Sequence, residues 1–411
     1  MDIVWLLPAV PLFLLVISLV ITVHELGHYW VGRMFGAAVE SFSLGFGRSI
    51  LEKRDSRGTR WRLNWIPLGG FVKFVGEVQL AQDLNQEIPE TVATEAQALE
   101  ARGKTTILHE NQILVGKPYT HLNPWQRIAV SLGGPFANFI FAALIFAIMG
   151  FAFGVSQSKQ VQVTEVIAGG PAELAGFKAQ DIIVKVAGRP VTSSMDVTSV
   201  TSLSAREPVE FNIRRGTDNL SLTVTPVEKE EIDPALNTRQ KIGRIGMGLT
   251  QVDTSLRRLN PIEALGYGVS RTGEALGQTF NVVRRLVTGK EGIDKLSGPV
   301  GILHLTGGVT QMTMKQEGVD LGRKLGDLAL VLVQLAALLS VGIGFFNLLP
   351  LPILDGGAVV MTLAEAATGK PLPDKVQNAG LTIGLVCLVT FALVVTLQDT
   401  LRLPIGLPWG S

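Results

Sequence analysis

Four long apolar stretches interrupt an otherwise mixed sequence. They occupy residues 3–31, 128–153, 328–349 and 379–397. A transmembrane helix needs about 20 predominantly apolar residues, so this pattern predicts four membrane-spanning helices. The first stretch has Asp2 where a signal peptide carries basic residues, and its helical pattern continues through His28. We therefore expect the first stretch to be retained as a span.

The sequence between the second and third apolar stretches has a different residue pattern, in which short apolar runs are separated by Gly, Pro and Asp. Alternation of apolar and polar residues with a period of two predicts strands at PVEFNIRR (208–215) and LSLTVTPV (220–227). We expect a small β-rich domain over residues 154–235. This domain divides the membrane part into an N-terminal half, residues 1–153, and a C-terminal half, residues 326–411.

The linker predicted over residues 236–325 contains an amphipathic helical pattern at 261–287. Pro261 suits the first helical turn, and Asn260 is a candidate N-cap. Such a helix can pack against the rest of the protein or lie on the membrane surface. The pattern alone leaves both alternatives open.

Composition supports a membrane protein and excludes some partners. Hydrophobic residues make up 47% of the 411 residues, charged residues 17%, and the mean hydropathy is +0.34. A net charge of +1 gives no reason to expect a nucleic-acid partner. The loop after the first span is rich in Arg and Lys, so the positive-inside rule places this loop in the cytoplasm and the β-rich domain outside.

The first span ends in the sequence HELGH, which places His24, Glu25 and His28 among apolar residues. Residues four positions apart lie on the same face of a helix, so the two imidazoles can bind one metal ion together. Glu25 can then reach a water molecule at the metal without being a ligand. Ionisable groups within a span are costly, which favours a function for them. The alternative is that neighbouring carbonyl groups satisfy both histidines.

A catalytic zinc site uses three protein ligands and keeps one position open. Candidates for the third ligand are acidic residues of another span and the remaining histidines, His109, His121 and His304. Asp355 follows the third apolar stretch, behind Pro350 and Pro352, which interrupt a helix. Spacing leaves open whether Asp355 is a ligand or part of an ordinary Asp-Gly turn.

Taken together, these motifs resemble the site-2 protease family, and the nearest branch is the bacterial regulator-of-sigma-E type. The motifs occur in family order: HELGH, then WIPLGGFVKFVGE (65–77), KPYTHLNPWQR (117–127), GGPFANFIFA (133–142), LSGPVGI (296–302) and NLLPLPILDGG (347–357). The stretch at 168–191 is similar to a circularly permuted bacterial PDZ domain. The resemblance thus covers both membrane halves and the domain between them.

The resemblance implies an intramembrane zinc metalloendopeptidase with one Zn²⁺ per chain. His24, His28 and Asp355 match the family's metal ligands, and Glu25 matches its catalytic acid/base. The fold it implies is a polytopic α-helical membrane protein with about four transmembrane helices, a re-entrant β-loop and one small extracytoplasmic PDZ-like domain.

Further positions match elements with other family roles. Six of them match elements that hold substrate: Asn347, Pro350 and Pro352 near the metal, and Gly69, Gly70 and Phe71 in the re-entrant β-loop. A partly submerged strand edge could pair with an extended substrate, although a plain surface hairpin is the alternative. Gly134 and Asn138 match a pattern that packs the second span on the first, and we expect a packing role for both.

The resemblance also implies partners and a location. The substrates would be single-span membrane proteins, of the anti-sigma-factor or remnant-signal-peptide type, cut after a first protease has acted. The protein would cross the inner (plasma) membrane several times, with its active site toward the cytoplasm. The PDZ-like domain could bind a peptide C-terminus or exclude bulky substrates.

Two departures from the family pattern concern substrate range and regulation. Ala358 stands where many relatives carry a polar residue, and there is one PDZ-like domain where some have two. Two other function classes remain. One is a non-catalytic membrane scaffold, which the intact Glu25 disfavours. The other is a zinc transporter or sensor, which would require metal ligands on more spans.

Overall fold

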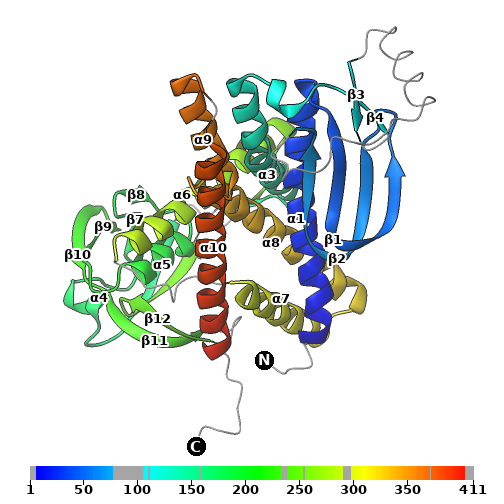
Figure 1. Cartoon of the computed structure of the whole chain (residues 1–411). Coiled ribbons are helices and arrows are strands. Elements are labelled where there is room, and N and C mark those ends of the chain that lie inside the picture. Colours follow the sequence, from blue (N-terminus) through cyan, green and yellow to red (C-terminus); the bar gives the residue numbers. More distant parts are fainter. Residues whose placement is uncertain are drawn as a thin grey trace, which may run out of the picture.

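The computed structural model describes residues 6–76, 105–109, 112–157, 160–233, 238–252, 255–289, 298–370 and 372–402. Within this part, four helices are long and apolar enough to cross a membrane, which confirms the prediction from the apolar stretches. They are α1 (Leu6–Met34), α3 (Pro124–Phe153), α8 (Leu321–Asn347) and α10 (Asp374–Arg402). In Figure 1 these helices form the centre of the molecule, with β structure on two opposite sides.

Helices α1 and α3 pack closely because glycines face each other where they meet. A β-carbon at Gly133 of α3 would lie 2.8 Å from the carbonyl oxygen of Gly27 in α1. Small residues allow membrane helices to approach in this way. Helix α3 also contacts α8, so that it joins the N-terminal membrane half to the C-terminal half.

Five further helices complete the described α-helical part. Of these, α6 begins with a capping box, in which Asn260 and Glu263 each accept a hydrogen bond from the other's backbone N–H. The N-cap predicted at Asn260 is therefore confirmed. The helices are α4 (Pro171–Leu174), α5 (Ser194–Leu203), α6 (Pro261–Val287), α7 (Pro299–Met314) and α9 (Asp355–Thr368).

The two faces of α6 differ. One face packs on α3, where a β-carbon at Gly268 would meet Ala147 at 3.0 Å. Another face leaves large apolar side chains exposed, including Ile262, Val269 and Phe280. Packing against the protein thus accounts for one face of this helix only.

A twisted sheet of two long strands, β1 (Val39–Arg54) and β2 (Arg60–Phe74), follows α1. Both strands fold back, because Leu44 pairs with Leu63 on one side and with Gly70 on the other. The segment 70–74 consequently forms an edge of the sheet, and this edge lies against α1. Figure 1 shows the sheet in blue beside that helix.

The β-rich domain lies on the opposite side of the helices (Figure 1) and is built on a six-stranded sheet. The order of its main strands is β10-β9-β7-β6-β13, with β8 paired to β7. Both strands predicted from alternation are present, as β9 and β10. The sheet includes β13, which lies beyond residue 235, where the sequence placed the end of the domain. The strands are β6 (Gln160–Val166), β7 (Ile182–Val186), β8 (Arg189–Pro190), β9 (Val209–Arg215), β10 (Asp218–Val224) and β13 (Met247–Val252).

Three short antiparallel pairs and one 3-10 turn connect these parts. They are β3 (Thr106–His109) with β4 (Gln112–Val115), β5 (Val155–Gln157) with β14 (Ser255–Arg257), β11 (Val227–Asp233) with β12 (Thr238–Arg244), and η2 (Tyr119–His121).

Candidate metal centre

The two histidines of HELGH lie one turn apart on α1 and point to the same place. Their Nε2 atoms are 3.1 Å apart. His24 is buried, and only 12% of the His28 side chain is exposed. The helix therefore presents two ring nitrogens together inside the bundle, as the spacing predicts.

Asp355, the first residue of α9, completes the group. Its Oδ2 lies 3.0 Å from Nε2 of His24, and its Oδ1 lies 3.4 Å from Nε2 of His28. One ligand atom from each of the three residues lies within 4.8 Å of the others. The structure thus brings together the three residues that the sequence analysis proposed as ligands. Among the described side chains, those of His121 and His304 are not part of this group, and the side chain of His109 lies outside the part that the structure describes.

The turn before α9 determines where Asp355 lies. Helix α8 ends at Asn347, and Leu354 N–H donates to the carbonyl of Leu351 before α9 begins. At Gly356 and Gly357, a β-carbon would fall on carbonyl oxygens of the same turn. Only glycine fits at these two positions, so the LDGG sequence allows the turn to fold tightly behind Asp355.

A hydrogen bond to α3 fixes the orientation of His28. Its Nδ1 is 2.8 Å from the carbonyl oxygen of Val130. A carbonyl can only accept, so Nδ1 carries the hydrogen and Nε2 keeps its lone pair for a metal.

The same face of α3 carries two further residues that touch the histidines. Asn138 Nδ2 lies 3.3 Å from Nδ1 of His24. At Gly134, a β-carbon would lie 2.7 Å from Nε2 of His24. The sequence predicts only a packing role for Gly134 and Asn138, and none for Val130. The four-residue spacing of 130, 134 and 138 was the signal that one face of α3 meets the histidines.

Glu25 lies between the histidines and the edge of the β1–β2 sheet. The backbone N–H of Val72 donates a hydrogen bond to its carboxyl group. A β-carbon at Gly70 would lie 3.4 Å from Cγ of Glu25. The strand edge and the acidic residue are therefore direct neighbours.

Gly69 and Phe71, predicted to hold substrate, flank Gly70 on the same strand. Gly69 has a φ of +97°, and a β-carbon there would meet the ring of Phe46 at 2.7 Å. Phe71 stacks on Phe46 with ring centroids 6.3 Å apart. Gly69 is thus needed for the local backbone and packing, because its conformation disfavours other residues.

Asn347, Pro350 and Pro352 lie in the segment that leads to Asp355. The side chain of Asn347 is half-buried and has no hydrogen bond among the described residues. Pro352 packs on α10, where a β-carbon at Gly380 would be 3.5 Å from its Cβ. A contact with α10 is thus one role of Pro352.

The donor set fits zinc. Two imidazole nitrogens 3.1 Å apart cannot both direct lone pairs into the same space without a cation or a proton between them. Two histidines and a carboxylate, with a further position free, form a common catalytic zinc site. A charged residue beside them, Glu25, is available for proton transfer.

Comparison with known proteins identifies the family. The sequence model of peptidase family M50 matches residues 12–391 of this chain. Metalloprotease MmpA of Caulobacter vibrioides is 36% identical over 394 residues, which cover 95% of this chain and 94% of that protein. A provisionally named zinc metalloprotease of Agrobacterium fabrum is 34% identical over 389 residues, covering 94% of each chain. This chain belongs to peptidase family M50, the site-2 protease family, and is a zinc metalloprotease.

Proposed function

We propose that the protein hydrolyses peptide bonds within transmembrane segments of membrane proteins. The observation that supports this is the position of the candidate metal centre: His24 and His28 lie on a helix long and apolar enough to span a membrane, and Asp355 directly follows the turn after another such helix. A peptide bond would have to reach this depth to be cut.

His24, His28 and Asp355 would hold the zinc ion. Bound zinc supplies a Lewis acid that polarises the scissile carbonyl and lowers the pKa of an attacking water to about 7. Glu25 accepts the proton of that water and delivers it to the leaving amine. Asn347, at the end of α8, is a candidate donor to the substrate backbone or to the developing oxyanion.

The edge of the β1–β2 sheet is well placed to hold the substrate. Helices hide their amide groups, so a substrate helix must unwind before it is cut. An extended segment can pair with the edge that carries Gly70 and Val72, next to Glu25. Two observations support a re-entrant position for this sheet. Ser18, in the middle of α1, donates a 2.6 Å hydrogen bond to the carbonyl of Pro67, and the nearby Trp65 is 69% exposed.

The positive-inside rule and the family resemblance support the orientation. The basic loop after α1 would lie in the cytoplasm, with the active site toward that side, and the β-rich domain would lie outside. The chain would sit in the inner (plasma) membrane. Its substrates would be single-span proteins of the anti-sigma-factor or remnant-signal-peptide type, cut after another protease has shortened them.

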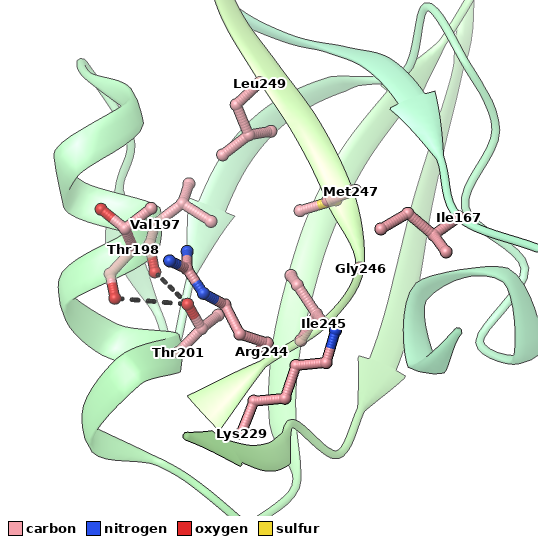
Figure 2. A pocket seen from close by; sticks show the side chains of 10 residues that line it. All are labelled: Ile167, Val197, Thr198, Thr201, Lys229, Arg244, Ile245, Gly246, Met247 and Leu249. Atoms are coloured by element: carbon pink, nitrogen blue, oxygen red, sulfur yellow. Dashed lines mark hydrogen bonds between the residues drawn. The ribbon is translucent and has the colours of Figure 1, made fainter. Parts of the chain in front are cut away.

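The β-rich domain offers a separate site for part of such a substrate. Strand β13 is the last of its sheet, and among the described strands none pairs with its outer edge. Figure 2 shows a groove between this strand and α5, with Val197 and Thr201 on the helix side and Met247 and Leu249 on the strand side. The groove has a volume of about 230 Å³.

Charge favours one kind of peptide for this groove. Lys229 and Arg244 line it, and none of the residues that line it is acidic. We propose that a peptide with a free C-terminal carboxylate binds along β13 as an added strand. The two cations favour a PDZ-like domain that binds peptides. A domain that only excluded bulky substrates would not require them.

The test of protease activity uses purified protein in detergent and a single-span test substrate. Wild type and Glu25→Gln are compared for cleavage and for zinc content. We expect cleavage by wild type alone, with about one zinc per chain in both proteins. Absence of zinc in wild type would refute the ligand set, and zinc-loaded Glu25→Gln that still cleaves would refute the role of Glu25. A scaffold would bind substrate without cutting it, and a transporter would move zinc regardless of Glu25.

A further inference from the structure

Asn138 makes an asymmetric contact with the candidate metal centre. The residue is fully buried on α3, and its Nδ2 lies 3.3 Å from Nδ1 of His24. Its Oδ1 is buried and has no hydrogen-bond partner among the described residues. The backbone carbonyl of Asn138 is held separately, by a 2.9 Å hydrogen bond from Ser340 on α8.

The two histidines differ in how their tautomer is determined. For His28, the carbonyl of Val130 can only accept, so Nδ1 must carry the hydrogen. For His24, the partner is an amide, whose two ends have the same shape and opposite hydrogen-bonding character. His24 can therefore adopt either tautomer, depending on which end of Asn138 faces it.

Each tautomer belongs to a different network. With Nδ2 facing the ring, Nδ1 accepts, and Nε2 carries a hydrogen beside the carboxylate of Asp355, whose Oδ2 is 3.0 Å away. With Oδ1 facing the ring, Nδ1–H donates, and Nε2 has a free lone pair. Only the second arrangement allows His24 to bind zinc through Nε2 while Asp355 binds as well. In either arrangement one amide atom lacks a partner, so the contacts of Asn138 within the protein do not choose between them.

We propose that Asn138 is a positioning residue that selects the zinc-binding tautomer of His24. Its amide turns Oδ1 toward Nδ1–H when zinc occupies the site, and the metal-free site favours the opposite orientation. This inference rests on the ligand set under Proposed function, and it adds that the second span controls zinc affinity through a residue that is not a ligand.

The test measures zinc affinity by competition with a fluorescent chelator, using full-length protein in detergent. Asn138→Leu removes the acceptor, and loss of such a partner typically weakens metal binding about 10–100-fold. Asn138→Asp keeps an atom that can only accept, so it is expected to bind zinc at least as tightly as wild type. Ser340→Ala is the matched control, because it removes a buried hydrogen bond to Asn138 without touching the imidazole.

A second measurement does not depend on how the variants fold. Nitrogen-15 spectra of wild type labelled at histidine are expected to show a change of tautomer for one ring when zinc is added, and a ring that keeps Nδ1–H throughout for His28. Three results would each overturn the inference. Asn138→Leu and Asn138→Asp could weaken zinc binding equally, Asn138→Leu could leave zinc binding unchanged, or the spectra could show no change of tautomer. If wild type binds no zinc, the ligand set itself is wrong, which is a separate outcome.

Discussion

Gly134 lies against both imidazole rings, and a β-carbon added there would be 2.7 Å from Nε2 of His24. We predict that Gly134→Ala displaces the rings and abolishes most zinc binding and activity, because real β-carbons do not approach other atoms so closely. Zinc content and cleavage of the test substrate measure the effect.

The control for Gly134→Ala is the same change at Gly273, on the exposed side of α6, where an added β-carbon meets nothing within 4 Å. Alanine is favoured over glycine within a helix by up to about 1 kcal/mol. Gly273→Ala should thus leave zinc binding intact and slightly stabilise the protein. If Gly134→Ala and Gly273→Ala reduced zinc binding equally, this result would contradict the proposed crowding at Gly134.

Asp55, in the turn between β1 and β2, gives a pH-dependent contribution to stability. Partial burial raises the pKa of its carboxyl group, but hydrogen bonds from Trp61 Nε1 and from the backbone N–H groups of Arg57 and Thr59 outweigh burial and lower it below its ordinary value. The stabilisation is then present above the unfolded pKa of about 3.9 and is lost as the pH falls through the folded pKa.

We predict that Asp55→Asn lowers the melting temperature at pH 7, and that its difference from wild type shrinks as the pH falls below about 4. Thermal unfolding in detergent measures both. Glu52→Gln is the matched control, because Glu52 lies near the end of β1, just before Asp55, in a more exposed pair with Arg62. A difference between wild type and Asp55→Asn that is constant with pH would refute the argument.

The sequence was sufficient to propose His24, Glu25 and His28 because one short motif places them on a single helix face. Asp355 required the family resemblance, since an Asp-Gly pair after a span has the same local pattern whether or not it binds metal. Val130 acts through its backbone carbonyl, which no side-chain pattern encodes. Asn138 had a recognisable motif, but its contact with His24 depends on how two helices cross.

At the scale of elements, the groove between α5 and β13 gives a prediction that is independent of the metal centre. We expect the double variant Lys229→Gln, Arg244→Gln to lose affinity for peptides with a free C-terminal carboxylate, because both cations line the groove. Fluorescence anisotropy with labelled peptides measures the change, and an amide-capped peptide tests the carboxylate directly.

Arg189→Gln is the control for the groove, since Arg189 is an exposed cation of the same domain and does not line it. We expect no change in peptide affinity for this variant. Equal binding of free and capped peptides to wild type would show that the groove does not recognise a carboxylate. Absence of binding altogether would favour a size filter.

The spanning helices and α6 were predictable because their apolar patterns and caps are local. The course of β1 and β2 was not, since a strand that folds back and pairs on both sides has the same alternation as one in a simple hairpin. Similarly, β13 joins the β-rich sheet after an intervening hairpin, so composition along the chain did not reveal where the domain ends.

At the scale of the whole molecule, one ion pair connects the two membrane halves through the helix that begins with Asp355. Arg127, in the first turn of α3, lies 2.7 Å from Glu365 of α9, and both side chains are largely buried. Because α9 begins with Asp355, this pair supports the helix that carries the third candidate ligand. Breaking a buried pair leaves an uncompensated charge, which is strongly destabilising.

We predict that Arg127→Gln or Glu365→Gln alone reduces zinc affinity and activity, and that the double variant recovers part of the loss. Zinc competition and substrate cleavage measure the coupling between the two positions. Arg271→Gln, in an exposed pair with Glu274 on α6, should change neither quantity. Strictly additive losses in the double variant would show that the pair does not connect the halves.

The candidate ligands are divided between the two ends of the chain, with His24 and His28 near the beginning and Asp355 close to the end. A ribosome therefore completes the helix with HELGH, the second span and the whole β-rich domain before it reaches the third ligand. With this ligand set, newly made chains would be unable to cut neighbouring proteins while they are still being inserted, because the candidate centre is incomplete until α9 is in place. The order of synthesis would then delay proteolysis until α9 has been made.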